Sequence, residues 1–267
     1  MLACVVNISE GRRDAVIDAV AASAADELLD LHSDADHNRT VLTLVGEAAP
    51  RAVATAAIRQ LDLRDHVGVH PRFGVVDVVP FMPLTGSTMT DAVAARDRFL
   101  AWLAGEHSVP GFAYGPERTL PEVRRRAFVD LAPDVGPDHP HATAGATAVG
   151  ARGPLVAWNV WLAQPDVPLA RRIAAEIRGP HIRALGLMVG DGAQVSMNLL
   201  SPNAVGPAEA WDLVAARAPV ARAELVGLVP RAVLERTPRQ RWDQLDLAED
   251  KTFEHRLTAR APHPGSG

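Results

Sequence analysis

The residues best suited to chemistry lie in one short stretch, Gly68–Pro83, which reads GVHPRFGVVDVVPFMP. His70 and Arg72 flank a proline, and an apolar run follows at Val75–Phe81, interrupted only by Asp77. The length and β-branched content of this run predict a buried strand. An imidazole, with an ordinary pKa of about 6.5, can accept and donate protons at neutral pH, and a guanidinium binds anions. The pattern therefore predicts a proton-transfer group beside an anion-binding group at the mouth of a buried strand.

Other interpretations of these residues stay open. His70 could be an ordinary turn residue, and Arg72 could pair with Asp77 or with a helix end. His66 and His70 stand four apart, the spacing of a helical zinc pair, although the glycine and proline beside them disfavour a helix.

A second polar cluster, Ser33–Asn38, separates two strand-like segments. Asp36 and Asn38 could hold a substrate amine or amidinium, and arginines at nearby turns and strand ends could hold carboxylates. Those arginines are Arg12, Arg39 and Arg72. The same region also has a metal-like set, His32, Asp34, Asp36 and His37, for which a solvated turn is the alternative.

The middle of the chain, Gly115–Gly153, is dense in proline, glycine, aspartate and histidine. A long irregular segment inside a compact domain is usually functional or disordered. We expect a binding loop that joins two lobes, with one short helix near Glu122–Asp130. Gly145 and the small residues after it could let a backbone approach a flat ligand, or could instead be the close-packed start of a strand.

Hydrophobic periodicity places the remaining elements around these segments. In the first half we expect strands at Leu2–Ile8, Glu27–His32, Thr40–Val45 and Gly111–Tyr114, and helices at Pro50–Leu61, Thr90–Ala104 and after a capping Ser9. In the second half we expect strands at Leu155–Leu162, Ala184–Val189, Gln194–Leu199 and Ala223–Val229, and helices at Val167–Arg178, Pro207–Arg217 and Pro230–Arg236. This order predicts an α/β (α+β) fold with two ferredoxin-like βαββαβ subdomains and a ligand groove between them.

The strand Gln194–Leu199 alternates strictly between apolar and polar residues. Its polar positions, Gln194, Ser196 and Asn198, could line a cleft or face water on an open sheet. Trp158 and Trp161 fall on opposite faces of their strand, so at most one of them can reach such a cleft.

Composition excludes some partners. The net charge is −5 and no long Lys/Arg run occurs, which argues against nucleic acid. Cys4 is the single cysteine, so no internal disulfide can form, as suits a cytoplasmic protein. The first apolar segment is too short to span a membrane or to direct export.

Six strings, in order along nearly the whole chain, resemble glutamate formiminotransferase, the transferase part of formiminotransferase-cyclodeaminase. They are CVVNISEGR (Cys4–Arg12), LLDLHSDADHNRTVLTLVG (Leu28–Gly46), VHPRFGVVDVVPF (Val69–Phe81), APDVGPDHPHATAGATAVGAR (Ala132–Arg152), AQVSMNLL (Ala193–Leu200) and ELVGLVP (Glu224–Pro230). The resemblance implies an N-terminal subdomain at 1–150, a C-terminal subdomain at 151–260 and a flexible tail at 261–267.

The resemblance also implies an activity: the formimino group of N-formimino-L-glutamate moves to N5 of tetrahydrofolate, a step of histidine degradation and one-carbon metabolism. His70 is then the general acid/base, the enzyme is a homodimer, and neither a metal nor a membrane takes part. The folate-contacting stretch of the family matches ten consecutive positions: Gly136, Pro137, Asp138, His139, Pro140, His141, Ala142, Thr143, Ala144 and Gly145.

Three positions depart from the family pattern. Ala144 stands where a tryptophan is usual, Val69 where a glutamate is usual, and Gly153 where a basic residue is common. Because these positions adjoin the expected pterin wall and the expected base, a folate- or small-anion-binding homologue without transferase activity is an alternative. A metal-dependent amidohydrolase built on the His/Asp clusters is another.

Overall fold

The computed structural model of the chain describes residues 1–69 and 72–260. His70 and the expected tail at 261–267 lie outside the described residues. The chain divides into two compact units, Met1–Gly153 and Pro154–Gly267. Each unit has its own sheet and its own hydrophobic core, and the mixed α/β fold class is confirmed.

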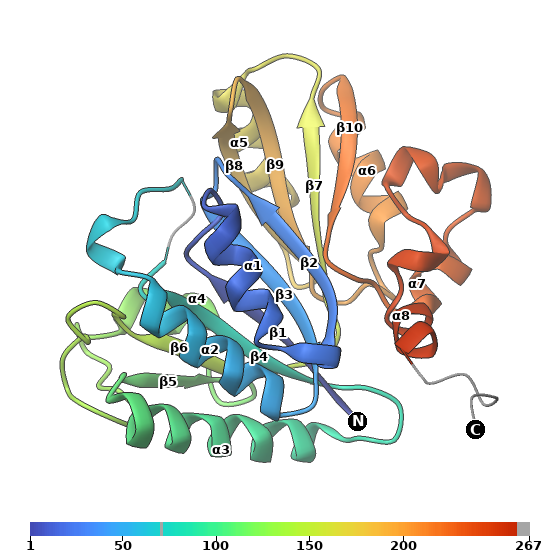
Figure 1. Cartoon of the computed structure of the whole chain (residues 1–267). Coiled ribbons are helices and arrows are strands. Elements are labelled where there is room, and N and C mark those ends of the chain that lie inside the picture. Colours follow the sequence, from blue (N-terminus) through green and yellow to red (C-terminus); the bar gives the residue numbers. More distant parts are fainter. Residues whose placement is uncertain (70–71, 261–267) are drawn as a thin grey trace, which may run out of the picture. The chain divides into compact units, whose positions relative to one another are not determined.

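The first unit is built on a six-stranded sheet with the order β2-β3-β1-β4-β6-β5 (Figure 1). Its strands are β1 (Leu2–Ile8), β2 (Leu28–Asp34), β3 (Arg39–Val45), β4 (Val76–Pro83), β5 (Gly111–Tyr114) and β6 (Thr147–Ala151). The first four strands pair antiparallel in the order expected of a βαββαβ unit, and β6 then pairs parallel with both β4 and β5. The first unit is therefore the expected ferredoxin-like arrangement extended by two strands.

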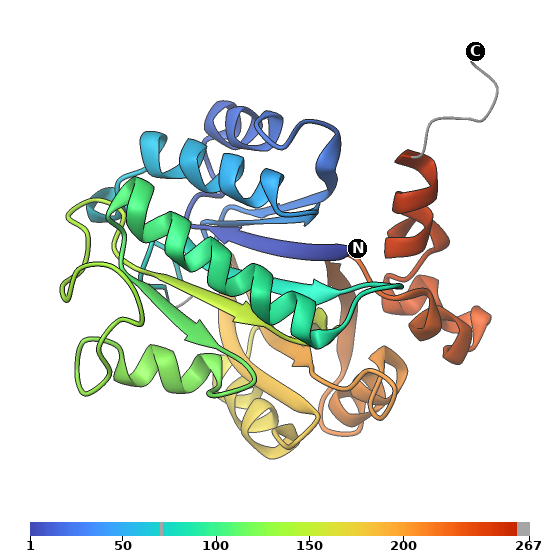
Figure 2. The same cartoon turned by 90° about the horizontal axis from the view of Figure 1, so that it is seen from below.

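Helices cover both faces of this sheet. They are α1 (Asp14–Ala22), α2 (Ala48–Gln60), α3 (Met89–His107) and α4 (Leu120–Arg126). The first three pack side by side over one face and share a single core with β1, β3 and β4 (Figure 2). On the other face α4 contributes Val123 to a smaller apolar cluster that contains Phe112, from β5, and Val78, from β4.

Two local expectations for this unit are wrong. Ser9 does not cap α1, because its hydroxyl donates instead to the Gly74 carbonyl oxygen, at 2.8 Å, and α1 begins five residues later. The expected loop at 115–153 ends in a central strand, β6, whose sequence TAVGA is entirely buried. Small residues gave this strand no hydrophobic signal, although parallel pairing on both sides makes it a core element.

The second unit is a four-stranded antiparallel sheet with the order β10-β7-β9-β8. Its elements are β7 (Val156–Leu162), α5 (Val167–Ile177), β8 (Ile182–Val189), β9 (Gly192–Leu199), α6 (Pro207–Ala215), β10 (Val220–Val226), α7 (Arg231–Arg236) and α8 (Phe253–Arg260). Through β10 the element order and strand order are those of a ferredoxin-like fold, as expected. The sequence patterns did not predict α8.

The alternation along β9 is confirmed on its apolar side. Val195, Met197 and Leu199 lie in the core of the second unit together with residues of α5 and α6. Trp158 is buried in the same core and donates its indole N–H to the Leu245 carbonyl oxygen, at 3.0 Å. Trp161, three residues along β7, lies outside that core, with the Arg222 guanidinium 4.2 Å from its ring centroid.

Candidate functional site

The chain that follows residue 71 is joined to the segment expected to contact folate. Phe73 accepts a hydrogen bond from the Ala146 N–H, at 2.8 Å, and Val75 donates to the Ala144 carbonyl oxygen, at 2.9 Å. The Ala144 end of this segment is fixed further by His141, whose Nδ1 accepts from the Ala144 N–H at 3.0 Å. Two stretches some 70 residues apart in sequence thus form one small backbone assembly.

Two glycines make this close approach possible. Gly74 and Gly145 face each other in an antiparallel bridge, and Gly145 has φ +70°. A β-carbon on Gly74 would lie 1.9 Å from the Ala146 carbonyl oxygen, and one on Gly145 would lie 2.3 Å from that of Phe73. Neither contact is sterically possible, so only glycine fits at either position without a backbone shift.

The chain that precedes residue 70 is held by Asn38, at the tip of the β2–β3 hairpin. Asn38 is buried and has φ +48°, a conformation that asparagine tolerates better than most residues. Its Nδ2 donates to the Val67 carbonyl oxygen at 2.9 Å and lies 3.2 Å from the His66 Nδ1, while its Oδ1 accepts from the Gly11 N–H at 2.9 Å. One side chain therefore connects the first strand, the hairpin and the loop that leads to His70.

His66 is held in its neutral form. Burial, followed by the nearby positive charge of Arg72, lowers the pKa of His66 to about 4. Its Nδ1 faces the Asn38 amide nitrogen, which is a donor, so that ring nitrogen is an acceptor and the proton sits on Nε2. Sequence spacing offered His66 only as a zinc-ligand partner of His70, and the structure places it as a hydrogen-bonded neutral imidazole.

Two arginines, one from β3 and one from α4, converge on Asp77 of β4. Arg39 and Arg124 both donate to Oδ2 of Asp77, at 2.8 and 2.5 Å, and the Phe73 N–H donates to Oδ1 at 3.0 Å. Burial opposes ionisation of Asp77, but the two guanidinium groups outweigh it and hold the pKa of this carboxyl below its ordinary value. The predicted Arg39 thus lies in a buried charge cluster, and Arg124, which the sequence analysis missed, lies in it too.

Arg72 belongs to the same region. Its guanidinium donates to the carbonyl oxygens of Gly68 and His66, at 3.2 and 3.4 Å. Burial lowers the pKa of Arg72, Asp77 raises it, and the positive charges of Arg39 and Arg12 lower it further. The effect of Asp77 on the pKa of Arg72 is consistent with the alternative interpretation, in which Arg72 pairs with Asp77.

The turn after β1 carries a preorganised carboxylate. Glu10 is buried and accepts the backbone N–H groups of Gly11, Arg12 and Arg13, at 2.8–3.0 Å, as well as the Arg13 side chain. Although burial opposes it, these bonds lower the pKa of Glu10. The predicted Arg12 is exposed and donates to the Ala35 carbonyl oxygen at 2.7 Å, and Asp36, beside that carbonyl, is exposed too.

The residues of the expected folate stretch differ in their surroundings. Asp138 and His139 are exposed and bond to each other at 2.9 Å. From Gly136 to Pro140 the segment is exposed, except at the half-buried Pro137. After it, His141 and Thr143 are half-buried and Ala142 is exposed. Ala144 and Gly145 are buried. The buried end is thus the part that meets the Phe73–Val75 backbone.

The polar side chains of β9 differ in their exposure to solvent. Gln194 is completely buried, and neither atom of its amide has a partner among the described residues; Ser196 is half-buried and Asn198 is exposed. Gln194 pairs across the sheet with Trp161, whose indole N–H is also buried and unpaired among the described residues. Buried polar groups normally find a partner, so the surroundings of Gln194 and Trp161 are suited to a polar ligand or a water molecule.

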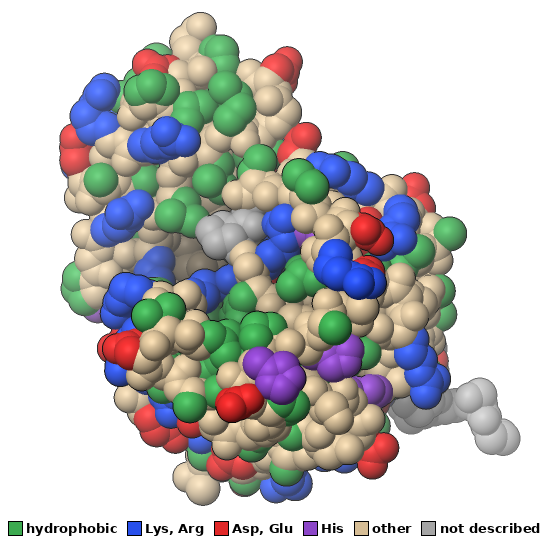
Figure 3. Space-filling model, turned by 90° about the vertical axis from the view of Figure 1, so that its left-hand side faces the viewer, with side chains coloured by type: hydrophobic (Ala, Val, Ile, Leu, Met, Phe, Trp, Pro, Cys, Tyr) green, Lys and Arg blue, Asp and Glu red, His purple; other side chains and the backbone are tan. Residues whose placement is uncertain are grey.

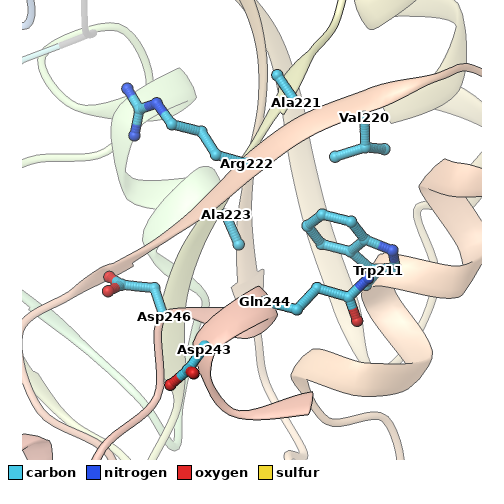
Figure 4. A pocket seen from close by; sticks show the side chains of 8 residues that line it. All are labelled: Trp211, Val220, Ala221, Arg222, Ala223, Asp243, Gln244 and Asp246. Carbon is cyan, nitrogen blue, oxygen red and sulfur yellow. The ribbon is translucent and has the colours of Figure 1, made fainter. Parts of the chain in front are cut away.

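Three further features bear on the candidate chemistry. In the parts of the chain that the structure describes, no three His, Cys, Asp or Glu side chains gather as a metal site would need, and no helix is long and apolar enough to cross a membrane. A pocket in the second unit, bordered by β10 and Trp211, contains none of the predicted site residues (Figure 4). Its Asp246 is already engaged by the Leu225 N–H and by Lys251.

Positive charge is prominent on the surface as well. Lys and Arg side chains, drawn in blue, are numerous on the side of the molecule shown in Figure 3. In the first unit, Arg39 and Arg124 both donate to the carboxylate of Asp77.

Comparisons with known proteins agree with this arrangement. Residues 1–152, more than half of the chain, match the formiminotransferase domain, N-terminal subdomain. A glutamate formimidoyltransferase of Streptococcus pyogenes is 40% identical over 74% of this chain and 77% of its own length. One from Thermoplasma acidophilum is 34% identical over 88% of this chain and 89% of its own.

The formimidoyltransferase-cyclodeaminase of Sus scrofa is 35% identical over 88% of this chain, which spans about half (51%) of that relative. The family match and these relatives lead to one conclusion. This chain belongs to the formiminotransferase family.

Proposed function

We propose that this protein is a glutamate formimidoyltransferase, which moves the formimino group of N-formimino-L-glutamate to N5 of tetrahydrofolate. Family membership supports the proposal. The structural observation that carries it is the backbone assembly between Phe73–Val75 and Ala144–Ala146, which joins the loop of the expected base to the expected folate segment. Residues 1–150 and 151–260 serve as the two subdomains.

The proposed chemistry needs one proton shuttle. Attack by the folate amine releases a proton, and departure of the glutamate nitrogen requires one. His70 accepts the first and donates the second, because an imidazole does both near neutral pH. The tetrahedral carbon that forms carries three nitrogens, and holding both substrates together supplies much of the rate.

The donor and acceptor have separate sets of proposed contacts. The donor's carboxylates and amidine are recognised from the first unit, by Arg12, Arg39, Arg72, Asp36 and Asn38. Asn38 acts there mainly by holding the loop that leads to His70. Tetrahydrofolate is contacted by residues 136–145 and by the polar face of β9 through Gln194, Ser196 and Asn198, and the unpaired amide of Gln194 supports a ligand there.

The cellular setting is part of the proposal. We place the enzyme in the cytoplasm, where a single buried free thiol such as Cys4 is stable. It acts as a homodimer on small molecules only, with tetrahydrofolate as co-substrate and without a metal, a membrane or a nucleic acid.

His70→Ala is the direct test. The substitution should lower kcat for transfer by about 10²–10⁴, the usual contribution of a general acid/base. The assay follows 5,10-methenyl-tetrahydrofolate, by its absorbance after acid treatment, from formiminoglutamate and tetrahydrofolate. Near-wild-type turnover of the variant would remove this mechanism. Tight tetrahydrofolate binding by the wild type with no turnover would instead select a folate-binding homologue.

A further inference from the structure

Residues 141–145 form a small closed loop at the end of the expected folate segment. His141 and Gly145 exchange two backbone hydrogen bonds, at 2.8 and 2.9 Å, which bring the ends of the loop together. The imidazole of His141 binds the same loop, because its Nδ1 accepts the Ala144 N–H at 3.0 Å and the Thr143 N–H at 3.3 Å. The side chain of His141 thus holds the backbone of the loop that His141 itself begins.

The peptide units that donate to His141 also bind the segment of the expected base. The Thr143 carbonyl oxygen accepts the Leu63 N–H at 2.7 Å, and the Ala144 carbonyl oxygen accepts the Val75 N–H at 2.9 Å. Leu63 and Val75 lie on either side of the expected base in the sequence. The 141–145 loop is therefore hydrogen-bonded to both ends of the base segment, residues 63–75.

The loop and the base segment are also closely packed. A β-carbon on Gly145 would lie 2.3 Å from the Phe73 carbonyl oxygen and 2.6 Å from Leu63 Cδ2. Val75 and Ala144, which are joined by a backbone hydrogen bond, are both buried. Because buried backbone groups must stay paired and packed neighbours move together, a shift of the loop would move the base segment with it.

The hydrogen bonds define which form of the His141 ring can hold the loop. A backbone N–H only donates, so Nδ1 has to be the acceptor and the ring proton has to lie on Nε2. The neutral ring with this tautomer binds the loop, and Nε2 takes no part in the contact. The two ring nitrogens can therefore be tested separately.

We propose that His141 is a positioning residue, which fixes the 141–145 loop through its Nδ1 and, through that loop, sets the position of the base segment. The inference rests on the function proposed above. Within the stretch proposed to contact tetrahydrofolate, it assigns the Nδ1 of His141 to the placement of the base.

The kinetic test compares His141→Asn with His141→Gln. The asparagine oxygen is bonded to Cγ, as Nδ1 is, whereas the glutamine oxygen is one bond farther out, as Nε2 is. His141→Asn keeps an acceptor for the Ala144 N–H, so its kcat should stay within about threefold of the wild type. His141→Gln should lower kcat about 10- to 100-fold, with KM for tetrahydrofolate within about twofold, because a misplaced base loses rate and not affinity.

His255 in α8 supplies the control, since it is exposed and lies in the second unit. His255→Gln should match the wild type in kcat and in both KM values. Better activity in His141→Gln than in His141→Asn would assign the function of the ring to Nε2, and so to a direct ligand contact. That result, an equal effect of the two His141 variants, or a raised KM for tetrahydrofolate with unchanged kcat would each overturn the inference.

Hydrogen exchange followed by mass spectrometry tests the inference without turnover. In His141→Gln, peptides that cover residues 63–75 and 141–146 should exchange faster, on the order of fivefold, as when one hydrogen bond is lost. Peptides of the second unit should be unchanged, and His141→Asn should exchange like the wild type. Faster exchange confined to residues 141–146, or spread over both units, would show that His141 does not act on the base segment.

The exchange experiment also separates this inference from the proposed function. Faster exchange at residues 63–75 in His141→Gln supports the positioning role even if the wild type transfers nothing. Normal transfer by the wild type, with unchanged exchange and unchanged kcat in His141→Gln, rejects the positioning role and leaves the function standing. Absence of transfer in the wild type together with unchanged exchange in His141→Gln rejects both.

Discussion

His66, four residues before the expected base in the sequence, has a lowered pKa and a hydrogen-bond partner that suits its neutral form. The folded protein keeps the ring neutral, with burial as the main cause and Arg72 as the second. Its pKa is about 4 in the folded state, while the ordinary value is 6.5. Its neighbour Asn38 presents a donor to Nδ1, which suits an unprotonated nitrogen.

This shift predicts a pH dependence of stability. Between pH 6.5 and pH 4 the unfolded chain binds a proton at His66 that the folded chain does not bind. Stability due to this group is therefore complete above pH 6.5 and is lost progressively as the pH falls toward 4. We expect the urea midpoint to fall less between pH 7 and pH 5 in His66→Gln than in the wild type.

The exposed His139 supplies the matched control, because its side chain is 75% exposed. His139→Gln should show the same pH dependence of the urea midpoint as the wild type. A wild-type slope that persists in His66→Gln would show that another group is responsible.

At the scale of elements, the joint between the chain after residue 71 and the start of β6 depends on glycine. Gly74→Ala would place a β-carbon 1.9 Å from the Ala146 carbonyl oxygen, which is backbone and cannot rotate away. We expect a loss of about 3 kcal/mol in the free energy of unfolding, as for an overpacked core site. Urea denaturation measures it.

Gly105 in α3 provides the contrast. It is exposed, and nothing lies within 4 Å of a β-carbon built there. Gly105→Ala should stabilise the protein by about 0.5–1 kcal/mol, because alanine restricts the unfolded chain and favours a helix. If both alanine variants changed stability alike, the steric account of the Gly74 joint would be wrong.

At the scale of the whole molecule, the charge distribution bears on the kind of chemistry. Arg39, one of the proposed donor contacts, and Arg124 both donate to Asp77, and guanidinium groups disfavour a bound cation beside them. The buried carboxylate of Glu10, in the turn after β1, is committed to three backbone N–H groups. This electrostatic character favours proton transfer by an imidazole over metal-assisted hydrolysis.

Prolonged dialysis against a chelator should accordingly leave transferase activity within about twofold of the untreated enzyme. Elemental analysis of the same samples reports any metal that was present before dialysis. Loss of activity that returns with zinc, manganese or iron would support the amidohydrolase alternative.

The sequence by itself determined the elements whose signals are local. The strands Leu2–Ile8 and Gly111–Tyr114 were predicted with their observed bounds, because apolar runs between turn residues reveal a strand without reference to the rest of the chain. The ferredoxin-like order of the second unit followed from the same periodicity. The arginines of the candidate site could be proposed in part, because Arg39 and Arg72 lie near strand ends.

Only the tertiary structure decided what long-range contacts control. The strand β6 consists of small residues with no periodic signal, so the sequence left a strand start and a ligand-binding backbone as alternatives, and the pairing with β4 and β5 showed the strand. Arg124 lies 47 residues from Asp77, in a segment without a chemical motif, and only the fold brings it within hydrogen-bond distance of that carboxylate. Sequence patterns report the preferences of neighbours along the chain, whereas a charge cluster is made by the packing of elements that are distant in it.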